Sequence, residues 1–413
     1  MKRPIAISLS PNMEKDDVWL AVKMLFSPIN WFNFRKTEKL EKEFAKRFGK
    51  NYKAVAMNSG RGALYLILKT LGIKRGDEVI LQALTCVVVA NSIRWAGARP
   101  VYVDVDRSYN LDPEKLSEKI SERTKAIIVQ HSFGTPANMK LIKKIARKHK
   151  ITLIEDCAIS LGAKYSGKQV GTIGDISFFS FGRDKVISSV FGGMILTKNV
   201  KLYEALKSGK DSLNYPSPFW VIQQLLHPIL FFLILPLYNI GFGKLTIGKV
   251  LLFGFQKLKT LSMPVCKDEK RGITLKAFPL KMPGALAVLA LNQFKKLDEF
   301  NKHRKLIARK YFKMLSKTNF ILPPKNKGSI WHRFPILHNN AKRIFNLAKK
   351  NKILLGDWYR KPVVPVGSIY SAGYEKGSCP KAEKYSRELI NLPTYPTLNF
   401  EQAEEVVRVI KDG

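Results

Sequence analysis

The stretch Ser177–Lys185, with the sequence SFFSFGRDK, contains the pattern that decides the fold. The apolar run Ile176–Ser180 predicts a buried strand, and the lysine follows it in an aromatic-rich loop. Partial burial lowers the pKa of a lysine, and a neutral amine is what imine formation requires. Lys185 is therefore a candidate catalytic residue, although a single lysine in so basic a chain is usually exposed to solvent.

Strand-like apolar runs alternate with helical patterns from about residue 38 to residue 200. This alternation predicts a mostly parallel sheet between layers of helices, and such sheets bind ligands at the carboxyl ends of their strands. Amphipathic stretches such as Pro113–Ile120 and Met139–His149 separate the strands. The predicted strands are Lys53–Met57, Glu78–Leu81, Pro100–Val103, Ala126–Gln130, Thr152–Glu155 and Ile176–Ser180.

Two further stretches follow predicted strands. Ser59, Gly60 and Arg61 precede the apolar helix Ala63–Leu71, where small residues and the helix dipole favour a bound phosphate. An ordinary glycine turn has the same composition. Asp156 follows the strand Thr152–Glu155, where its carboxylate can pair with a protonated ring nitrogen of a cofactor or can cap a helix.

Taken in order, these stretches resemble the DegT/DnrJ/EryC1/StrS family of sugar aminotransferases. The likeness covers nearly the whole chain, and a collinear series of this kind is highly specific. It is carried by Ser59-Gly60, Gly76–Ile80, Gly97-Ala98, His131–Gly134, Glu155-Asp156, the spacing from Ser180 to Lys185, Gly192-Gly193, Gln293 to Asp298 and Leu392–Pro396.

The resemblance implies an α/β, fold-type-I transferase that depends on pyridoxal 5′-phosphate (PLP). Residues 1–265 then form the large domain with the mostly parallel sheet, including an apolar insertion at about 212–260. Residues 266–413 form a smaller α+β domain, with a long helix from Gly284 to about Leu315 and a final helix Glu401–Lys411. The implied assembly is a homodimer.

The resemblance also implies roles for single residues. Lys185 holds PLP as a Schiff base and moves the proton, Asp156 pairs with the pyridine nitrogen, and Ser180 binds the phosphate together with the backbone of Gly60 and Arg61. The implied reaction transfers an amino group, with glutamate as donor, to a nucleotide-linked keto-sugar for cell-surface polysaccharide or glycoconjugate biosynthesis.

Several positions depart from the family's pattern. Arg61 stands where the family has Thr or Ser, so we expect its guanidinium to contact the phosphate. Cys86 stands in the position of the aromatic residue that stacks on the cofactor, Ile159 replaces a Gln, and Pro279 replaces an Asn of the partner subunit. The expected cofactor-binding residues are Ser59, Gly60, Arg61, Cys86, Asp156, Ile159 and Ser180.

These departures leave two alternatives open. One is a divergent or non-catalytic protein of the same fold at a membrane, and the other is a PLP-dependent sugar dehydratase. Retention of Lys185 disfavours the dehydratases in which His replaces that lysine. A visible absorbance spectrum of the purified protein separates a cofactor-binding protein from one that has lost the cofactor.

The charge of the chain limits its partners. There are 71 Lys and Arg residues against 32 Asp and Glu residues, a formal charge of +39 that favours acidic substrates or an anionic membrane. A lineage-wide lysine bias would produce the same count. No nucleic-acid-reading motif is present, so we expect no nucleic-acid partner. The four cysteines form no CxxC pair and the N-terminus predicts no signal peptide, so we expect a cytoplasmic protein without a metal site.

The segment Ser212–Gly243 contains no Asp, Glu, Lys or Arg. We expect Pro228 and Pro236 to interrupt its apolar run and so to exclude a membrane-spanning helix. The lysines that follow at 244, 249, 257 and 259 predict that residues 219–255 lie at the surface of an anionic membrane. A helical hairpin buried at the dimer interface is the alternative.

Overall fold

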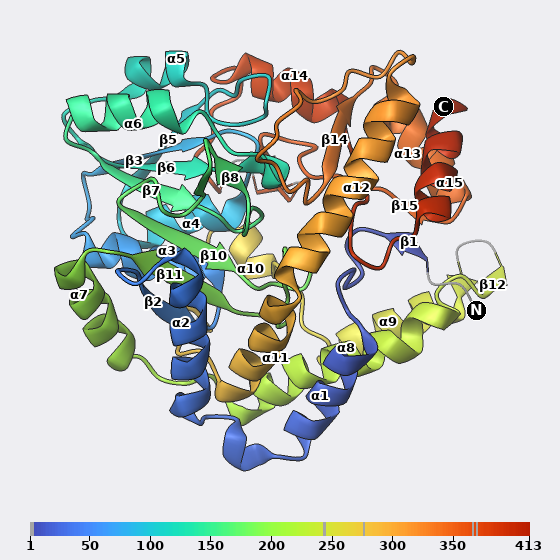
Figure 1. The fold of residues 1–413 in the computed structure, drawn as a ribbon, viewed down its shortest axis with the longest axis horizontal. Coiled ribbons are helices and arrows are strands. Elements are labelled where there is room, and N and C mark those ends of the chain that lie inside the picture. Colours follow the sequence, from blue (N-terminus) through green and yellow to red (C-terminus); the bar gives the residue numbers. More distant parts are fainter. Residues whose placement is uncertain (1–3, 243–244, 276, 366, 369–370) are drawn as a thin grey trace.

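The computed structural model describes residues 4–242, 245–275, 277–365, 367–368 and 371–413. Its centre is a seven-stranded sheet with the order β2-β11-β10-β7-β6-β3-β5 (Figure 1). Only β11 runs antiparallel to its neighbours, so the predicted mostly parallel sheet is confirmed. The strands are β2 (Lys53–Met57), β3 (Glu78–Gln82), β5 (Arg99–Val103), β6 (Thr124–Gln130), β7 (Thr152–Asp156), β10 (Ile176–Ser180) and β11 (Gly193–Thr197).

Helices cover both faces of this sheet because its strands are apolar on both sides. Successive side chains of a strand point to opposite faces, so Phe178 and Phe179 of β10 enter two different cores. Phe178 packs in the core that contains α3 (Gly60–Thr70) and α4 (Val87–Trp95). Phe179 packs in the core that contains α2 (Phe34–Phe48) and α11 (Gly284–Lys295).

A separate core lies in the C-terminal part of the chain. It is built by α12 (Leu297–Leu315), α13 (Ala341–Lys350), α15 (Phe400–Lys411) and the antiparallel pair β14 (Phe334–Leu337) and β17 (Leu389–Leu392). The expected single helix from Gly284 to Leu315 is two helices that meet at Lys296, because α11 packs on the large core and α12 on this one. The domain boundary at residue 265 stays a prediction.

The remaining elements are short or connect these layers. The expected helix Pro113–Ile120 is shorter, because only Pro113–Leu116 is α-helical and a 3-10 turn follows. The elements not yet described are β1 (Ile5–Ala6), α1 (Lys15–Leu25), β4 (Thr85–Cys86), α5 (Pro113–Leu116), α6 (Met139–Lys148), β8 (Lys164–Tyr165), β9 (Lys168–Gln169), α7 (Val200–Asp211), α10 (Lys267–Lys270), β15 (Ile353–Leu354), β16 (Val363–Val364) and α14 (Pro380–Glu388).

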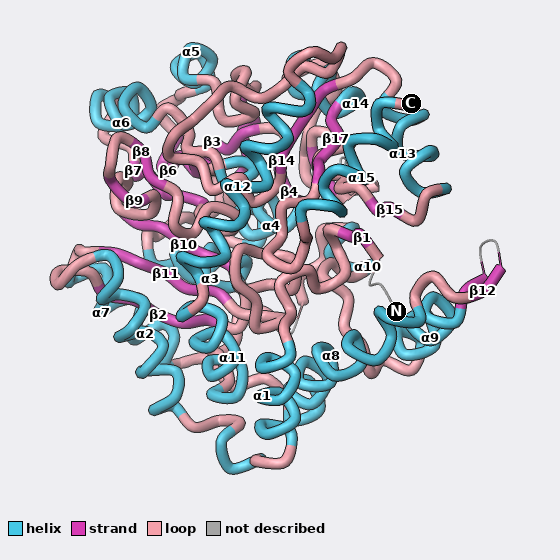
Figure 2. Tube along the Cα trace, turned by 45° about the vertical axis from the view of Figure 1, so that its right-hand side comes forward, coloured by secondary structure: helices cyan, strands magenta, loops and turns pink. Residues whose placement is uncertain are grey.

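The apolar insertion forms helices α8 (Pro218–Leu237) and α9 (Ile247–Lys257), joined by the hairpin β12 (Gly241–Phe242) and β13 (Leu245–Thr246). Both views place α9 and β12 at the edge of the molecule (Figures 1 and 2). The expectation that Pro228 and Pro236 interrupt the run is wrong, because α8 continues through both. Its packing against α1 and α11 offsets the backbone hydrogen bonds that the prolines remove.

Helix α8 is also the one described helix that is long and apolar enough to span a membrane, but 44% of its most apolar window is buried inside the protein. Phe231 and Ile234 are buried, whereas Leu233 is exposed. Length and composition therefore do not distinguish a membrane helix from a helix of the protein interior here. Lys244 lies outside the described residues.

Candidate active site

A cavity of about 190 Å³ lies where β6, β7 and β10 end and α3 begins. The catalytic and cofactor-binding residues that the sequence analysis selected all line it. They are Ser59, Gly60, Arg61, Cys86, Asp156, Ile159, Ser180 and Lys185. The cavity wall also contains Gln130, Arg183, Trp358 and Tyr359, which the sequence analysis did not select.

The first turn of α3 is shaped to receive an anion. The Ser59 hydroxyl caps the helix by accepting a hydrogen bond from the N–H of Gly62 at 3.0 Å. A Cβ at Gly60 would lie 2.8 Å from the Cβ of Ser180, so only glycine lets the strand end come this close. No described residue forms a hydrogen bond with the Ser180 hydroxyl, which therefore remains free to bind a phosphate together with the helix N-terminus.

Asp156 ends β7 as a buried carboxylate that is 3% exposed. Its Oδ1 accepts a hydrogen bond from the N–H of Ala158 at 2.9 Å, and no second side-chain hydrogen bond to it is made by the described residues. Burial raises the pKa of Asp156, and the positive charge of Lys185 partly opposes that effect. A buried carboxylate with a free oxygen fits the protonated ring nitrogen of PLP.

Glu155 has a structural role beside Asp156. It is completely buried and accepts hydrogen bonds from His131 Nε2 at 3.0 Å and from the N–H groups of Gly171, Ile173 and Gly174. Burial acts to raise the pKa of Glu155, but the hydrogen bonds from His131 and the backbone outweigh it and lower the pKa. Glu155 thus ties the loop before β10 to β7.

Lys185 follows β10 with its amine directed at an aromatic ring. Its Nζ lies 5.4 Å from the centroid of the Trp358 ring, and it forms no ion pair with a described residue. The neighbouring Asp184 is paired with Arg333 at 2.9 Å. Burial acts to raise the pKa of Asp184, but the charges of Lys185, Arg333 and Arg183 outweigh it and lower the pKa.

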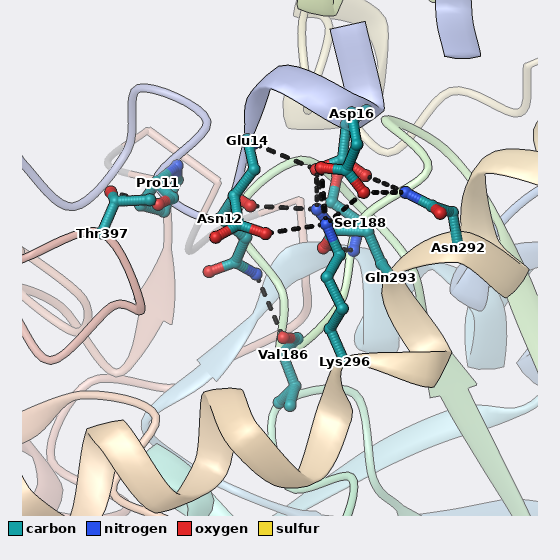
Figure 3. A network of polar contacts seen from close by, with 11 residues as sticks. Pro11, Asn12, Glu14, Asp16, Val186, Ser188, Asn292, Gln293, Lys296 and Thr397 are labelled. Atoms are coloured by element: carbon teal, nitrogen blue, oxygen red, sulfur yellow. Dashed lines mark hydrogen bonds and ion pairs between the residues drawn. The ribbon is translucent and has the colours of Figure 1, made fainter. Parts of the chain in front are cut away.

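The backbone after Lys185 is held by the N-terminal segment. Asn12 Nδ2 donates to the carbonyl oxygens of Lys185 at 2.6 Å and Val186 at 3.1 Å, and Figure 3 shows the second contact. Arg304 Nη2 donates to the same Val186 oxygen at 2.8 Å. Gln293 joins the two regions, because it donates to the Asn12 carbonyl at 3.0 Å and accepts from the Ser188 N–H at 3.1 Å.

The guanidinium of Arg61 does not have the surroundings that we expected for a phosphate ligand. It forms an ion pair with Glu269, donates to the Pro264 carbonyl at 2.6 Å and lies 4.7 Å from the centroid of the Phe278 ring. Burial lowers the pKa of Arg61 to about 10, so it stays protonated at neutral pH. Its Nη1 and Nη2 atoms are thus directed at Glu269 and Pro264.

Of the other three departures, Cys86 and Ile159 line the cavity and Pro279 does not. Cys86 is the N-cap of α4 and is buried, and burial raises the pKa of its thiol, which is neutral at physiological pH. Ile159 is partly exposed in the cavity wall. Pro279 is outside the wall, in a loop that Asn58 holds by donating to the Ala277 carbonyl at 2.8 Å.

The residues that the sequence analysis missed lack a local signal. Gln130 accepts from the Thr85 hydroxyl at 3.0 Å and donates to the Tyr359 hydroxyl at 2.9 Å, which joins β6, β4 and the C-terminal part of the chain. Trp358 and Tyr359 lie far along the sequence from Lys185 and belong to no motif. Arg183 lies inside the stretch quoted first, but its burial cannot be predicted from its neighbours.

Comparison with known proteins agrees with this geometry. The sequence profile of the DegT/DnrJ/EryC1/StrS aminotransferase family matches residues 14–213 and 254–411. An uncharacterised protein of Methanocaldococcus jannaschii is 31% identical over 396 residues, covering 91% of this chain and 89% of that protein. GDP-perosamine synthase of Escherichia coli O157:H7 is 29% identical over 383 residues, covering 91% and 89%.

Among solved structures, the Helicobacter pylori aminotransferase PseC superposes with a TM-score of 0.75 at 22% identity, covering 99% of this chain and 98% of that one. This likeness shows the fold, and the family profile shows the relationship of the sequences. The resemblance drawn from the motifs is confirmed. The chain therefore belongs to the DegT/DnrJ/EryC1/StrS aminotransferase family, and it is a PLP-dependent aminotransferase of fold type I.

Proposed function

We propose that this enzyme transfers the amino group of glutamate to a nucleotide-linked keto-sugar that is used in polysaccharide or glycoconjugate biosynthesis. The observation that carries the proposal is the meeting of Lys185, Asp156 and Ser180 in one cavity of a chain from this family. Its relatives include a GDP-perosamine synthase and a transaminase of a dTDP-linked amino sugar. The charge of +39 favours a phosphorylated substrate.

Each residue then has a defined role. The Ser180 hydroxyl and the backbone N–H groups of Gly60 and Arg61 bind the cofactor phosphate. Asp156 keeps the proton on the ring nitrogen, and bound PLP supplies the electron sink that stabilises a carbanion of the substrate. Lys185 would hold the cofactor and would move the proton at the substrate carbon. Trp358 excludes water on the side of the lysine amine.

The experiment is a two-substrate assay with purified protein, glutamate and a panel of nucleotide-linked keto-sugars. Formation of 2-oxoglutarate and of an amino sugar, both followed by mass spectrometry, is the expected result. A dehydrated sugar without consumption of glutamate would favour the sugar dehydratase instead. A protein without visible cofactor absorbance after incubation with PLP would favour the non-catalytic alternative.

We also propose that the enzyme is a homodimer in the cytoplasm and contacts the inner face of the membrane through residues 219–255. The exposed apolar side chains of the insertion support this contact, as do the exposed Lys257 and Lys259. The family profile leaves residues 214–253 unmatched. The exposed apolar residues on the insertion include Phe219, Leu233, Leu245, Ile247, Val250, Phe253 and Leu258.

At this surface, burial of apolar side chains in the membrane contributes more binding free energy than attraction of the lysines to anionic lipids. Burying one large apolar side chain contributes about 1.5–3 kcal/mol, whereas one lysine near an anionic membrane contributes about 1 kcal/mol. Charge then sets the lipid preference. Trp19, Phe26 and Ile29 are also exposed near the N-terminus, and such exposed apolar side chains support a dimer contact there.

A further inference from the structure

Arg183 is a buried cation in the cavity wall that forms no ion pair with a described carboxylate. The residue is 7% exposed, and its Nη2 donates to the Ser262 hydroxyl at 2.9 Å. Its Nε is buried without a hydrogen-bond partner, and no described residue forms an ion pair with it. Burial lowers the pKa of Arg183 to about 10, so the guanidinium still carries its charge at neutral pH.

The other positive groups around this cavity are differently placed. Arg61 is neutralised by Glu269, and Arg333 is neutralised by Asp184. Lys185 is the amine that the cofactor uses. Arg183 forms no ion pair with a described residue, although the neighbouring charge of Asp184 acts on it and its Cζ lies 5.8 Å from the centroid of the Phe191 ring. A buried guanidinium whose Nε lacks a hydrogen-bond partner is costly, which supports an anion that completes the site.

The apolar insertion holds this guanidinium in place. Ser262, which follows α9, accepts from Arg183 and donates to Oε1 of Gln224 at 2.7 Å. Gln224 is completely buried on α8 and donates to the Trp220 carbonyl at 3.0 Å. Gln224 lies in the segment that the family profile leaves unmatched. The insertion thus reaches the active site through a chain of polar contacts, besides forming an outer surface.

The position of Arg183 selects the chemistry of the anion. The same wall contains Gly60, the Ser180 hydroxyl and the first turn of α3, all of which favour a phosphate. A guanidinium presents several N–H donors in one plane and suits two oxygens of a phosphate at once. Nη2 is held by Ser262 and Nε has no hydrogen-bond partner, so the guanidinium still has a donor to offer an anion.

We infer that Arg183 binds a phosphate group in this cavity. The phosphate comes either from PLP or from the nucleotide of the sugar substrate, and the second source rests on the proposed function. The Arg183 guanidinium stays charged in a wall of low dielectric, where a contact between opposite charges is stronger than in water. The insertion residues Gln224 and Ser262 are positioning residues for it.

Binding measurements separate the two sources without requiring turnover. Apoprotein is titrated with PLP and with pyridoxal, which lacks the phosphate, and PLP-loaded protein is titrated with UDP and GDP by calorimetry. If Arg183 binds the cofactor phosphate, Arg183→Met lowers the affinity for PLP at least about tenfold, as expected for loss of a charge-assisted hydrogen bond, and leaves the affinity for pyridoxal unchanged. If the nucleotide phosphate is bound, PLP affinity is kept and diphosphate affinity falls by that factor.

Two variants control the measurement. Arg408→Met removes an exposed arginine of α15 and is expected to change none of these affinities. Gln224→Leu keeps Arg183 but removes the side chain that accepts the hydrogen bond of the Ser262 hydroxyl. We expect a smaller loss of affinity for the same ligand. It provides the readout if Arg183→Met does not fold.

Three outcomes overturn the inference. The first is that folded Arg183→Met binds both PLP and the diphosphates within twofold of wild type. The second is that the variant loses affinity for PLP and for pyridoxal equally. The third is that its PLP affinity is unchanged while even the wild-type protein binds no diphosphate. A failure of the aminotransferase assay alone would leave the PLP and pyridoxal comparison intact, so it tests the proposed function separately.

Discussion

The side-chain amide of Asn12 donates a hydrogen bond to the backbone carbonyl of Lys185 at 2.6 Å, across 173 positions of sequence. Asn12 is 1% exposed, and its Oδ1 accepts from Arg304 Nη2 at 3.1 Å. The N-terminal segment and α12 therefore both fix the loop that carries the lysine. A lysine that must reach one atom of a bound cofactor needs this support, since small displacements at a reacting group reduce rates strongly.

We predict that Asn12→Ala destabilises the protein and slows the reaction. The carbonyl oxygens of Lys185 and Val186 lose their shared donor, at a cost of about 1–3 kcal/mol in the free energy of unfolding. Urea denaturation and turnover with saturating substrates are the measurements. Asn351→Ala is the matched control, because that amide donates to the Leu347 carbonyl at the surface. Equal effects of the two variants would contradict the positioning role of Asn12.

Replacement of Lys185 by Ala is expected to abolish the visible absorbance of the lysine-bound cofactor. No other lysine lines the cavity among the described residues, so no second amine replaces it. The measurement is an absorbance spectrum before and after borohydride reduction, followed by peptide mass spectrometry. Lys198→Ala, an exposed lysine after β11, should retain the wild-type spectrum. A reducible adduct in the Lys185 variant would exclude the assigned role.

Asp156→Asn should separate activity from stability. Turnover is expected to fall strongly, because a neutral ring nitrogen draws fewer electrons from the carbanion. Since burial raises the pKa of Asp156 in the folded state, the folded protein binds more protons than the unfolded chain between pH 3.8 and that raised pKa. Ionisation of Asp156 therefore lowers the stability of the apoprotein as pH rises through this window.

The Asp156→Asn apoprotein should accordingly be more stable than wild type at pH 7.5, and the difference should vanish below pH 3.8. Denaturant unfolding of both apoproteins across this pH range checks the sign. A variant that is less stable than wild type at pH 7.5 would show that Asp156 is stabilised by its neighbours rather than strained by burial.

Gly60→Ala is expected to disturb the phosphate end of the site. Its new Cβ would lie 2.8 Å from the Cβ of Ser180, and overpacking of this kind costs about 1–3 kcal/mol. The measurements are thermal unfolding and PLP affinity, both of which should decrease. Gly254→Ala in α9 is the control, since nothing lies within 4 Å of its added Cβ, and helix propensity predicts a gain of about 0.5–1 kcal/mol. Equal behaviour of the two variants would contradict the close packing at α3.

The insertion should bind anionic vesicles, with only partial release by high salt. Phe253→Asp combined with Leu258→Asp should release the protein, because both side chains are exposed and the fold does not depend on them. Val200→Asp alters an exposed apolar residue at the start of α7 and serves as control. Co-sedimentation is the measurement. Wild-type protein that stays in the supernatant at low salt, as a dimer without detergent, would favour the insertion as interface core.

The central sheet could be predicted closely from the sequence because its signals are local. Lys53–Met57 and Ile176–Ser180 have the bounds expected from their apolar runs, since a strand buried on both faces needs a continuous apolar sequence. Asp156, Ser180 and Lys185 could be assigned to one site from the sequence because they end or follow predicted strands. Residues that follow parallel strands meet at the same edge of the sheet.

The sequence by itself determined the sheet, the family and the residues at the strand ends, whereas the tertiary structure decided which charges are paired and which helices continue. Arg61 and Arg183 are equivalent as sequence letters, but Arg61 forms an ion pair with Glu269, whereas Arg183 forms an ion pair with no described residue and Asp184 is paired with Arg333. Helix α8 continues through Pro228 because α1 and α11 pack against it. Both outcomes depend on contacts between distant segments, and local propensity contains no information about such contacts.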